Sequence, residues 1–566
     1  MEKIWLNQYP SGIPKSIELA AHETLVDVFE KSVLKYAKRP AYSNFGHTIN
    51  FAELNVLSAR FAAYLQNRLG LDKGDRVAIM MPNLLQYPVA LFGILRAGLV
   101  VVNVNPLYTA RELAHQLKDS GAKTIVIVAN SAHVLEEAIA EGAKVRSVIV
   151  TEVGDMLPFP KRQLLNFAVR HIKKMVPPYK LRHAKHFDET IGTSDLVYRR
   201  PRELEGGDLA FLQYTGGTTG VSKGAMLTHT NMVANMRQIN AWFSGVTRPG
   251  YDVVLTPLPL YHVYALTCNC LAYLETGGHN VLVTDPRDTA GLIKEMKKWP
   301  FTAMTGVNTL YQSLVKHPKL ESVNLTSMKI VSAGGMAVME PTARAWKEAT
   351  GTNILEGYGL SEASPVVTTN AATSTRYTGS IGLPLPDTDI KLLDDDGNEV
   401  EVGDPGELCV KGPQVMKGYW QRDDATAETM TKDGYLRTGD VATVDPLGFF
   451  RIVDRKKDMI LVSGFNVFPS EVEEVLVAHP DIDEAACIGV PDDTPEDGDS
   501  GEQVAAYIVL EKGSKLTVDA IKAYCKEELT PYKRPKIIEF RDELPKSNVG
   551  KIMRRELREE VLGKTA

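Results

Sequence analysis

The sequence predicts an α/β protein with a large N-terminal domain of parallel and mixed sheets, a small β-rich subdomain, and a smaller α+β domain at the C-terminal end. Three observations support this. Short β-branched runs alternate with helical patterns, closely spaced strands and turns begin near residue 378, and strand and helix patterns alternate again after residue 458. A chain of 566 residues corresponds to about three or four domains of average size.

The N-terminal part contains six short apolar runs that we expect to be strands. They cover residues 76–81, 123–129, 146–151, 252–259, 280–285 and 328–335. Runs of this kind, continuous in apolar residues and separated by helical patterns, are typical of parallel sheets that are buried on both faces. The most hydrophobic stretch, residues 88–104, contains Arg96 and is shorter than the ~20 apolar residues that span a bilayer. No transmembrane helix is therefore expected.

The pattern of expected strands and helices changes twice in the C-terminal half. Residues 378–454 read as a β-rich subdomain, in which "DDDGN" at 394–398 forms a hairpin turn because Asp and Gly accept positive φ. Residues 459–566 mix strand and helix and form the final domain, so the N-terminal domain covers residues 1–454. Within the last domain, residues 491–502 hold six acidic residues, which indicates a solvated surface loop.

Composition excludes several classes of protein. The net charge of −6 argues against bulk nucleic-acid binding, which requires a basic surface. Five widely spaced cysteines fit neither a secreted disulfide framework nor a zinc ribbon. The N-terminal residues contain no apolar run of signal-peptide length, so we expect a cytoplasmic protein.

A Gly- and Thr-rich loop, "YTGGTTGVSKG" at residues 214–224, follows a buried apolar run. Its backbone N–H groups and hydroxyls can surround phosphate oxygens, and Lys223 adds a positive charge. The Walker A and dinucleotide-binding patterns are both absent from it. "GVSKG" at residues 220–224 also matches the G-x-S-x-G elbow of α/β-hydrolases, with Ser222 as the nucleophile, so a hydrolase is one alternative.

Four further motifs follow this loop in order. They are "EGYGLSEASP" (356–365), "DGYLRTGDVATVDPLGFFRIVDRKKD" (433–458), "SGFNVFPSEVE" (463–473) and "PKSNVGKIMRREL" (545–557). With the loop they resemble the core motifs of the adenylate-forming superfamily, which includes acyl-CoA synthetases, luciferases and peptide-synthetase adenylation domains. The chain looks most like the bacterial ligases that join long-chain fatty acids to coenzyme A.

The resemblance implies a two-step reaction with ATP, Mg²⁺ and coenzyme A. A fatty acid first becomes an acyl-adenylate with release of pyrophosphate, and the thiol of coenzyme A then displaces AMP. The implied catalytic residues are Lys551, His262, Glu362 and Lys223, of which Glu362 also holds Mg²⁺. The implied ATP- or AMP-binding residues are Tyr214, Thr215, Gly216, Gly217, Thr218, Thr219, Gly220, Lys223, Gly334, Gly335, Met336, Glu356, Gly357, Tyr358, Gly359, Asp440 and Arg455.

The same resemblance implies a mobile C-terminal domain. It gives a hinge at residues 455–458, centred on Lys457, and an approach for the thiol of coenzyme A along Ser463, Gly464 and Phe465. The acyl pocket is expected at Gly306 and Val307, although a core helix explains the apolar residues there equally well.

Three positions depart from the family pattern. Val549 replaces a small hydroxyl residue, and Tyr435 and Arg437 replace the Trp and His that are frequent in fatty acyl-CoA synthetases. These departures leave open the acyl chain length more than the type of reaction.

A basic segment at residues 161–185 stands out by composition alone. No acidic residue occurs between Asp155 and Asp188, and apolar residues are interleaved with the basic ones, which suits an amphipathic helix at an anionic membrane surface. Its basic residues are Lys161, Arg162, Arg170, Lys173, Lys174, Lys180, Arg182 and Lys185. We expect peripheral contact with the inner face of the membrane, the alternative being a solvated helix packed on the protein body.

Three classes of function remain after this reasoning. The leading one is an ATP-dependent ligase for long-chain fatty acids that feeds fatty-acid degradation or lipid synthesis, with medium-chain or aryl acids as the alternative substrates. The others are an α/β-hydrolase that acts on lipids through Ser222 and a catalytically idle nucleotide- or lipid-binding protein. A homodimer remains one alternative for the assembly.

Overall fold

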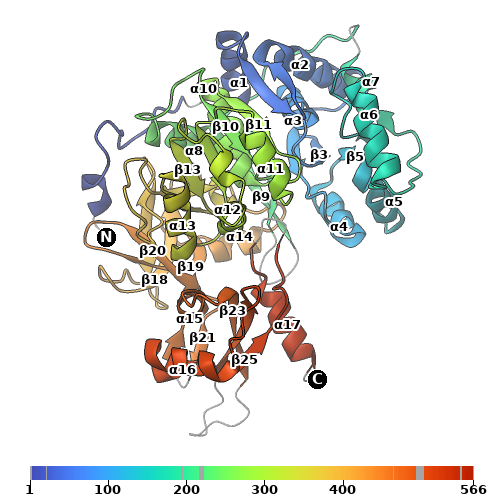
Figure 1. Ribbon diagram of the computed structural model, residues 1–566. Coiled ribbons are helices and arrows are strands. Elements are labelled where there is room, and N and C mark those ends of the chain that lie inside the picture. The colour runs from blue at the N-terminus through green and yellow to red at the C-terminus, as the bar shows by residue number, and fades with distance from the viewer. Residues whose placement is uncertain are drawn as a thin grey trace.

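A computed structural model describes residues 3–20, 22–192, 195–215, 222–462, 465–491, 502–547 and 551–564. The N-terminal part forms the large body of the molecule, in which two large sheets are covered by helices. The C-terminal domain lies below this body in Figure 1, next to the subdomain that contains β18, β19 and β20. The fold class expected from the sequence is confirmed.

One large sheet has seven strands in the order β7-β6-β5-β3-β4-β8-β9. All neighbouring strands are parallel except β8 and β9, which are antiparallel. The strands are β3 (Arg76–Met80), β4 (Val100–Asn103), β5 (Thr124–Val128), β6 (Ser147–Thr151), β7 (Lys185–His186), β8 (Leu209–Thr215) and β9 (Lys223–Thr228). Three of the expected strands lie here as β3, β5 and β6.

The other large sheet has nine strands in the order β16-β15-β14-β13-β12-β10-β11-β1-β2. Its centre is parallel, from β14 to β1, and both edges are antiparallel. The strands are β1 (Pro40–Asn44), β2 (His47–Asn50), β10 (Val253–Thr256), β11 (His279–Leu282), β12 (Ala303–Gly306), β13 (Ile330–Ala333), β14 (Leu355–Gly359), β15 (Val366–Thr369) and β16 (Leu383–Pro384). The other three expected strands are β10, β11 and β13.

Helices cover these sheets and begin where the sequence supplies caps. The side chain of Thr109 accepts a hydrogen bond from the backbone N–H of Glu112 in a capping box that starts α4, and Asn50 does the same for α2. The longer helices of this part are α1 (Leu25–Lys35), α2 (Phe51–Asn67), α3 (Gln86–Arg96), α4 (Ala110–Ser120), α5 (Ala132–Ala140), α8 (His229–Trp242), α11 (Thr289–Met296), α12 (Asn308–Val315) and α13 (Glu340–Thr350). Shorter ones are α6 (Lys161–Phe167), α7 (Phe187–Ile191), α9 (Val263–Ala265) and α10 (Ala272–Thr276).

The most hydrophobic stretch of the sequence becomes a buried helix and a buried strand. Every residue of α3 is buried, and β4 follows it in the centre of the seven-stranded sheet. Among the residues with described placement, no helix is both long and apolar enough to cross a membrane.

The β-rich subdomain is one antiparallel sheet in the order β17-β18-β19-β20. Its strands are β17 (Asp389–Leu393), β18 (Gly406–Lys411), β19 (Leu436–Val444) and β20 (Phe450–Arg455), with α14 (Asp423–Thr429) between β18 and β19. The turn expected at residues 394–398 is confirmed, because the backbone N–H of Asp394 donates to the carbonyl of Asn398 at 2.9 Å and Gly397 has φ of +85°. Tyr435 and Arg437, which depart from the family pattern, have hydrogen-bond partners within this subdomain. The hydroxyl of Tyr435 donates to Asp389, and the guanidinium of Arg437 donates to Glu407.

The C-terminal domain has hydrophobic cores of its own. Its elements are β21 (Ile460–Val462), β22 (Phe465–Val467), α15 (Pro469–Val477), β23 (Ile482–Pro491), β24 (Glu502–Leu510), α16 (Val518–Glu528), β25 (Ile537–Phe540) and α17 (Arg554–Lys564). The four strand and helix segments expected after residue 458 are confirmed as α15, β23, β24 and α16. The acidic loop lies outside the described residues except at its two ends.

The basic segment forms a shorter helix than its length suggests. Helix α6 continues only as a π-helical turn, η3 (Ala168–Ile172), and residues 173–184 are irregular. Lys174 has φ of +51°, and Pro177 and Pro178 follow, so the backbone cannot continue as a helix. The interpretation of residues 161–185 as one amphipathic helix is therefore wrong beyond Ile172.

Candidate active site

A cavity of about 2820 Å³ lies between the N-terminal part and the C-terminal domain. It gathers residues from all five motifs at the carboxyl ends of β13 and β14, beside β8, β19 and the segment around Lys551. The sequence-predicted residues that line it are Tyr214, Thr215, Lys223, His262, Val307, Gly334, Gly335, Met336, Glu356, Gly357, Tyr358, Gly359, Glu362, Asp440, Arg455, Lys457 and Lys551. Residues spread over more than 300 positions of the chain therefore face one space.

The base of the Gly-rich loop is a β-hairpin. Strands β8 and β9 pair antiparallel with Thr215 opposite Lys223, and the hydroxyl of Ser222 donates to the carbonyl of Thr215 at 2.7 Å. Gly216, Gly217, Thr218, Thr219 and Gly220 lie outside the described residues. A nucleophile elbow joins a strand to a helix, whereas Ser222 leads into strand β9. The hydrolase interpretation is therefore wrong.

Lys223 and Glu362 share an aromatic neighbour. The Nζ of Lys223 lies 5.3 Å from the ring centroid of Tyr419, and the hydroxyl of Tyr419 donates to Oε1 of Glu362 at 2.8 Å. Burial raises the pKa of Glu362 above its ordinary value, and the hydrogen bond from Tyr419 opposes that rise. Tyr419 carries no sequence signal for this role, because "KGYW" (417–420) matches no recognised motif.

The ends of β13 and β14 form a wall of the cavity that we expect to hold the adenine of the nucleotide, and we call it the adenosine wall. Gly335 has φ of +82°, a conformation that favours glycine, and a Cβ at Gly359 would lie 2.2 Å from the carbonyl oxygen of Pro365. Glu356 is buried and accepts from the backbone N–H of Val338 at 2.9 Å. Burial raises the pKa of Glu356 to about 7. Small residues and a buried carboxyl thus shape a flat, close-fitting wall.

Tyr358, near the end of β14 in this wall, meets Asp440 of β19. The hydroxyl of Tyr358 donates to Oδ2 of Asp440 at 2.6 Å, and Nε of Arg455 lies 3.6 Å from Oδ1 of Asp440. Arg455 is opposite Asp440 in the pairing of β19 and β20. Burial raises the pKa of Asp440, and the charge of Arg455 opposes that rise. This carboxylate is placed to accept hydrogen bonds from a polar ligand.

His262 is neutral near pH 7. Burial, and then the charge of Lys551, lower the pKa of His262 to about 4. Its Nδ1 accepts from the backbone N–H of Tyr264 at 3.3 Å, which leaves Nε2 as the N–H donor. Of the two forms considered for His262, the structure supports the neutral donor and not the cation.

Lys551 reaches the cavity from the C-terminal domain. The backbone N–H of Ser547 donates to the carbonyl of Lys551 at 2.7 Å, and the backbone N–H of Lys551 donates to the hydroxyl oxygen of Ser547 at 3.1 Å. Burial, followed by the charge of Arg455, lowers the pKa of Lys551 to about 8, whereas Asp440 acts in the opposite direction. Lys551, Asp440 and Arg455 thus line the same cavity in this conformation.

Of the residues expected at the hinge and along the thiol approach, Lys457 lines the cavity and Phe465 does not. Lys457 follows β20 and lines the cavity. Ser463 and Gly464 lie outside the described residues. Phe465 is 56% exposed and stacks on Tyr532 at 4.8 Å between ring centroids, both within the C-terminal domain. Phe465 is thus not among the residues that line the cavity with Lys551.

The apolar part of the lining extends well beyond the two residues expected from the sequence. Val307 lines the cavity, whereas Gly306 packs against Tyr311, whose ring would lie 2.7 Å from a Cβ at Gly306. Further apolar residues of the lining include Ile239, Phe243, Val254, Leu258, Cys268, Tyr273 and Met304. They come from α8, β10, the segments directly after these two elements, the π-helix η4 (Leu266–Leu271), α10 and β12. Their pattern in the sequence is that of core residues, so no sequence signal distinguishes them.

Comparison with known proteins agrees with this geometry. Residues 29–420 match the model of the AMP-binding enzyme family, and residues 471–551 match that of the AMP-binding enzyme C-terminal domain. The chain belongs to the AMP-binding enzyme family.

Individual relatives give a finer comparison. The chain is 55% identical over 565 residues to the long-chain-fatty-acid–CoA ligase of Escherichia coli O157:H7, with 100% of this chain and 99% of that protein covered. It is 35% identical over 516 residues to the feruloyl-CoA synthase of an Amycolatopsis species, with 91% and 94% covered. Among solved structures, ATP-bound MatB from Rhodopseudomonas palustris matches with a TM-score of 0.81 and 29% identity, covering 94% of this chain and 98% of that one.

Proposed function

We propose that the protein is a ligase that joins long-chain fatty acids to coenzyme A through an acyl-adenylate. ATP and the fatty acid give acyl-adenylate and pyrophosphate, and coenzyme A then gives acyl-CoA and AMP. The observation that carries this proposal is the meeting of Lys551, Asp440 and Glu362 around one cavity whose lining also includes a large apolar part. The identity of 55% to a curated ligase of this specificity supports it.

The residues of the cavity can be given separate tasks in this reaction. Attack of a carboxylate on the α-phosphate gathers negative charge on the phosphate oxygens, which positioned cations and N–H donors stabilise. Lys551 and Lys223 supply the cations, and His262 supplies a neutral N–H donor. Asp440 accepts from the ribose hydroxyls, while Tyr358 covers the adenine, so the nucleotide is held while the acid approaches from the apolar side.

The residues fit Mg²⁺ as the metal. Proteins bind Mg²⁺ through one or two carboxylates together with substrate phosphates, and Glu362 is a half-buried carboxylate that lines the cavity and shares the neighbour Tyr419 with Lys223. Among the described residues, no group of three or more His, Cys, Asp or Glu side chains could hold a metal by itself. When bound with ATP, Mg²⁺ neutralises charge on the phosphate oxygens.

The two steps require different positions of the C-terminal domain. Lys551 lines the cavity with the residues of the adenosine wall, while Phe465 of the expected thiol approach is not among the lining residues. Rotation about Lys457 would exchange the two. The separate hydrophobic cores of the C-terminal domain support its movement as a unit.

Pyrophosphate release tests the proposed reaction. We expect release that depends on both ATP and a fatty acid, with acyl-CoA formed only when coenzyme A is added. Acids from C6 to C18 should be compared with a chain-free acid such as acetate. No release with any acid would contradict the proposal and leave the interpretation as a non-catalytic binding protein.

Medium-chain or aryl acids are the second candidate substrates. The 35% identity to a feruloyl-CoA synthase and the Tyr273 ring in the cavity lining favour testing them. The same assay with benzoate, ferulate and octanoate separates the two candidates. Higher kcat/KM for any of these than for palmitate would assign the protein to that substrate class.

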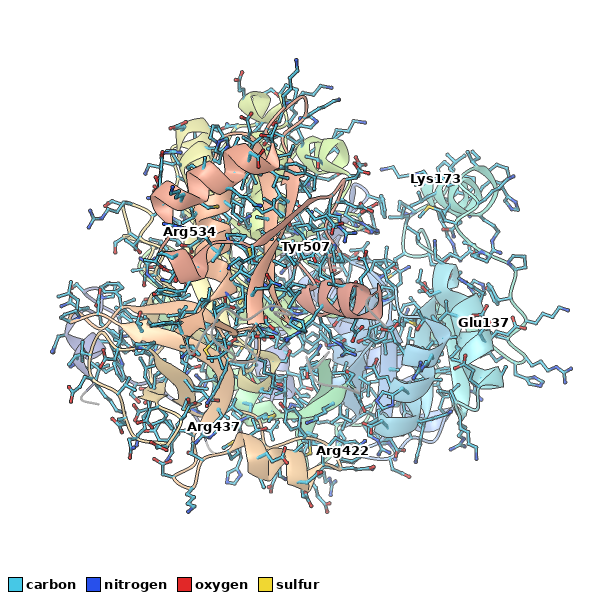
Figure 2. The ribbon with its side chains drawn as sticks, turned by 90° about the horizontal axis from the view of Figure 1, so that it is seen from below. Glu137, Lys173, Arg422, Arg437, Tyr507 and Arg534 are labelled. Atoms are coloured by element: carbon cyan, nitrogen blue, oxygen red, sulfur yellow. The ribbon has the colours of Figure 1, made fainter. Side chains whose placement is uncertain are left out.

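The basic segment at residues 161–185 supports peripheral contact with an anionic membrane. Lys173 projects from the edge of the molecule (Figure 2). Five large apolar side chains nearby are more than half exposed: Phe159, Leu164, Phe167, Ile172 and Met175. Apolar side chains that insert at the headgroup level beside basic residues are typical of peripheral membrane contact.

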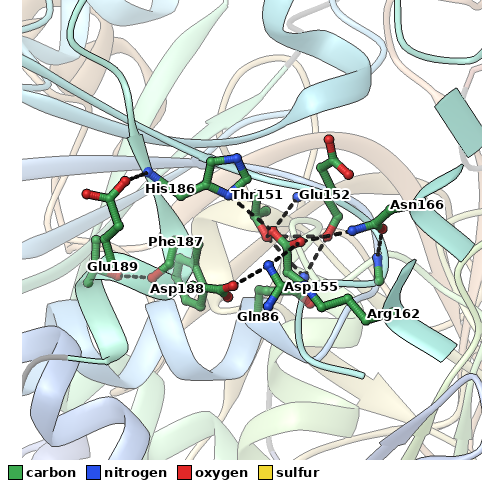
Figure 3. A network of polar contacts seen from close by, with 12 residues as sticks. Gln86, Thr151, Glu152, Asp155, Arg162, Asn166, His186, Phe187, Asp188 and Glu189 are labelled. Carbon is green, nitrogen blue, oxygen red and sulfur yellow. Dashed lines mark hydrogen bonds and ion pairs between the residues drawn. The ribbon is translucent and has the colours of Figure 1, made fainter. Parts of the chain in front are cut away.

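Two basic residues of this segment hold the helix on the protein instead. Arg162 pairs with Asp188, and Arg170 pairs with Glu152. Asn166 donates to Oδ1 of Asp155 at 3.1 Å in the network shown in Figure 3. This network leaves Lys173, Lys174, Lys180 and Arg182 as the better candidates for lipid contact.

Vesicle binding tests the membrane proposal. Each basic residue near an anionic surface contributes roughly 1 kcal/mol, so replacing Lys173, Lys174, Lys180 and Arg182 by Gln should release the protein from phosphatidylserine vesicles. A matched control replaces Lys294, Lys297, Lys298 and Lys319, which lie elsewhere on the body. Unchanged binding in the first variant, or equal loss in both, would contradict a specific role for the segment.

A further inference from the structure

Helix α12 connects the adenosine wall to the C-terminal domain. Nζ of Lys316, directly after α12, lies 2.8 Å from Oδ1 of Asp483 and 2.7 Å from Oε1 of Glu511. The side-chain amide of Gln312 also donates to Oδ1 of Asp483 at 2.9 Å. Asp483 is in β23 and Glu511 follows β24, so both carboxylates belong to the C-terminal domain.

The other end of this connection is fixed to the site. Oδ1 of Asn308, the first residue of α12, accepts from the backbone N–H of Met339 at 3.0 Å, in the loop that follows Met336. The hydroxyl of Tyr311 donates to the carbonyl of Ser332 in β13 at 2.7 Å, and Tyr311 is fully buried. Helix α12 is therefore fixed against β13, the strand that ends at the adenosine wall.

On the C-terminal side, the connection continues to Lys551. Glu484, next to Asp483 in β23, forms an ion pair with Lys546. Lys546 pairs with Ile552, the residue after Lys551, in an antiparallel bridge. A movement of β23 away from α12 would therefore carry Lys551 away from Asp440.

We propose that Gln312 and Lys316 are positioning residues that hold Lys551 at the adenosine wall by binding Asp483 and Glu511. The inference rests on the proposed function and its two domain positions. These contacts exist only while the C-terminal domain lies as described, so they favour the adenylating position over the position for thioester formation. Loss of the contacts shifts the balance between the two positions without altering either set of reacting groups.

The exposure of these contacts determines how far their loss shifts the balance between the two positions of the C-terminal domain. The side chain of Lys316 is 47% exposed, and partly exposed ion pairs are weak. Loss of the two Lys316 pairs, with the Gln312 hydrogen bond kept, corresponds to a change of about three- to tenfold in the balance of two conformations. The quantity to measure is the ratio of the adenylation rate constant to the rate constant of thioester formation.

The test compares Lys316→Met with Lys347→Met as the control. Lys347 lies on the neighbouring helix α13, where its Nζ donates to Asn353 at 3.0 Å. Single-turnover pyrophosphate release from ATP and palmitate gives the first rate constant, and conversion of supplied palmitoyl-adenylate with coenzyme A gives the second. We expect the ratio to fall about three- to tenfold in Lys316→Met, with thioester formation equal or faster, and to stay unchanged in Lys347→Met.

A charge exchange separates positioning from general stability. Lys316→Glu alone faces two carboxylates and should lower the ratio further than Lys316→Met, whereas adding Asp483→Lys should raise it again. A ratio that stays within twofold in Lys316→Met, or two rate constants that fall together in folded protein, would overturn the inference. No pyrophosphate release by the unaltered protein would overturn the proposed function as well, so the two failures are distinguishable.

Discussion

The adenosine side and the Lys551 side of the cavity differ in how they are held. Tyr358, Glu356 and Asp440 lie on strands β14 and β19, whose apolar residues belong to the main hydrophobic core. Lys551 lies on a domain with separate cores and meets the body through polar contacts such as those of Lys316. The groups proposed to hold adenosine are built into the main core, whereas the lysine proposed to leave between the two steps is not. Polar contacts at a domain boundary break at lower cost than a buried apolar core.

Lys551→Ala gives the largest expected effect and tests this division directly. Removal of one oriented charge at the α-phosphate should slow acyl-adenylate formation by roughly 1000-fold. Conversion of supplied acyl-adenylate and coenzyme A should proceed at a near-normal rate, because Lys551 takes no part in that step. Both half-reactions should be timed in a quenched-flow instrument with folding checked by circular dichroism. Equal loss of both would mean that one fixed geometry serves both steps.

Glu362→Ala tests the fixed side of the cavity. Adenylate formation should fall at least ~100-fold, because the carboxylate proposed to hold Mg²⁺ is lost. Tyr419→Phe is the matched control, since it removes only the hydrogen bond at 2.8 Å to Oε1 of Glu362 and should cost much less. The Mg²⁺ concentration for half-maximal rate should rise in the first variant. Near-normal activity in folded Glu362→Ala would remove this residue from the mechanism.

Lys457→Pro tests the movement itself. Proline fixes φ near −65°, so a hinge that must change its backbone angles is blocked. Pyrophosphate release should persist, whereas thioester formation should slow by about 100-fold because the reacting groups are misplaced. Lys456→Pro, one residue earlier, is a useful comparison. The backbone N–H of Lys456 donates to the carbonyl of Gly439, so this substitution removes a hydrogen bond and is expected to disturb folding more. Thioester formation at the normal rate in Lys457→Pro would place the hinge elsewhere.

The pH profile gives the smallest expected effect. The cationic form of Lys551 is the active one, and its pKa is lowered to about 8, so kcat/KM for ATP should fall as pH rises through about 8, by tenfold per unit beyond it. A guanidinium stays charged in this range, so Lys551→Arg should show no such fall even if it is slower overall. The pKa of His262 near 4 predicts no inflection from this residue between pH 5 and 7. A fall that persists in Lys551→Arg would assign it to another group.

Local patterns in the sequence determined much of the fold. The six strands expected in the N-terminal part, the turn at residues 394–398, and the elements α15, β23, β24 and α16 all follow from periodicity and turn residues, which are local properties. The motif residues, such as Glu362, Asp440 and Lys551, were identified through the resemblance of the ordered motifs to the adenylate-forming superfamily. The end of the basic helix at Ile172 was missed, although Pro177 and Pro178 are local signals for it.

Only the tertiary structure decided which groups meet. Tyr358 and Asp440 are 82 residues apart, Glu362 and Tyr419 are 57 apart, and Gln312 and Asp483 are 171 apart. The sequence shows no local pattern that pairs such residues, because each pair is formed by the packing of separate strands and domains. The same holds for the neutral state of His262, which results from burial, and for the apolar cavity lining, whose residues are indistinguishable in sequence from the core around them. Sequence thus determined the elements and the reactive groups, and packing decided their partners, their charge states and the position of Lys551.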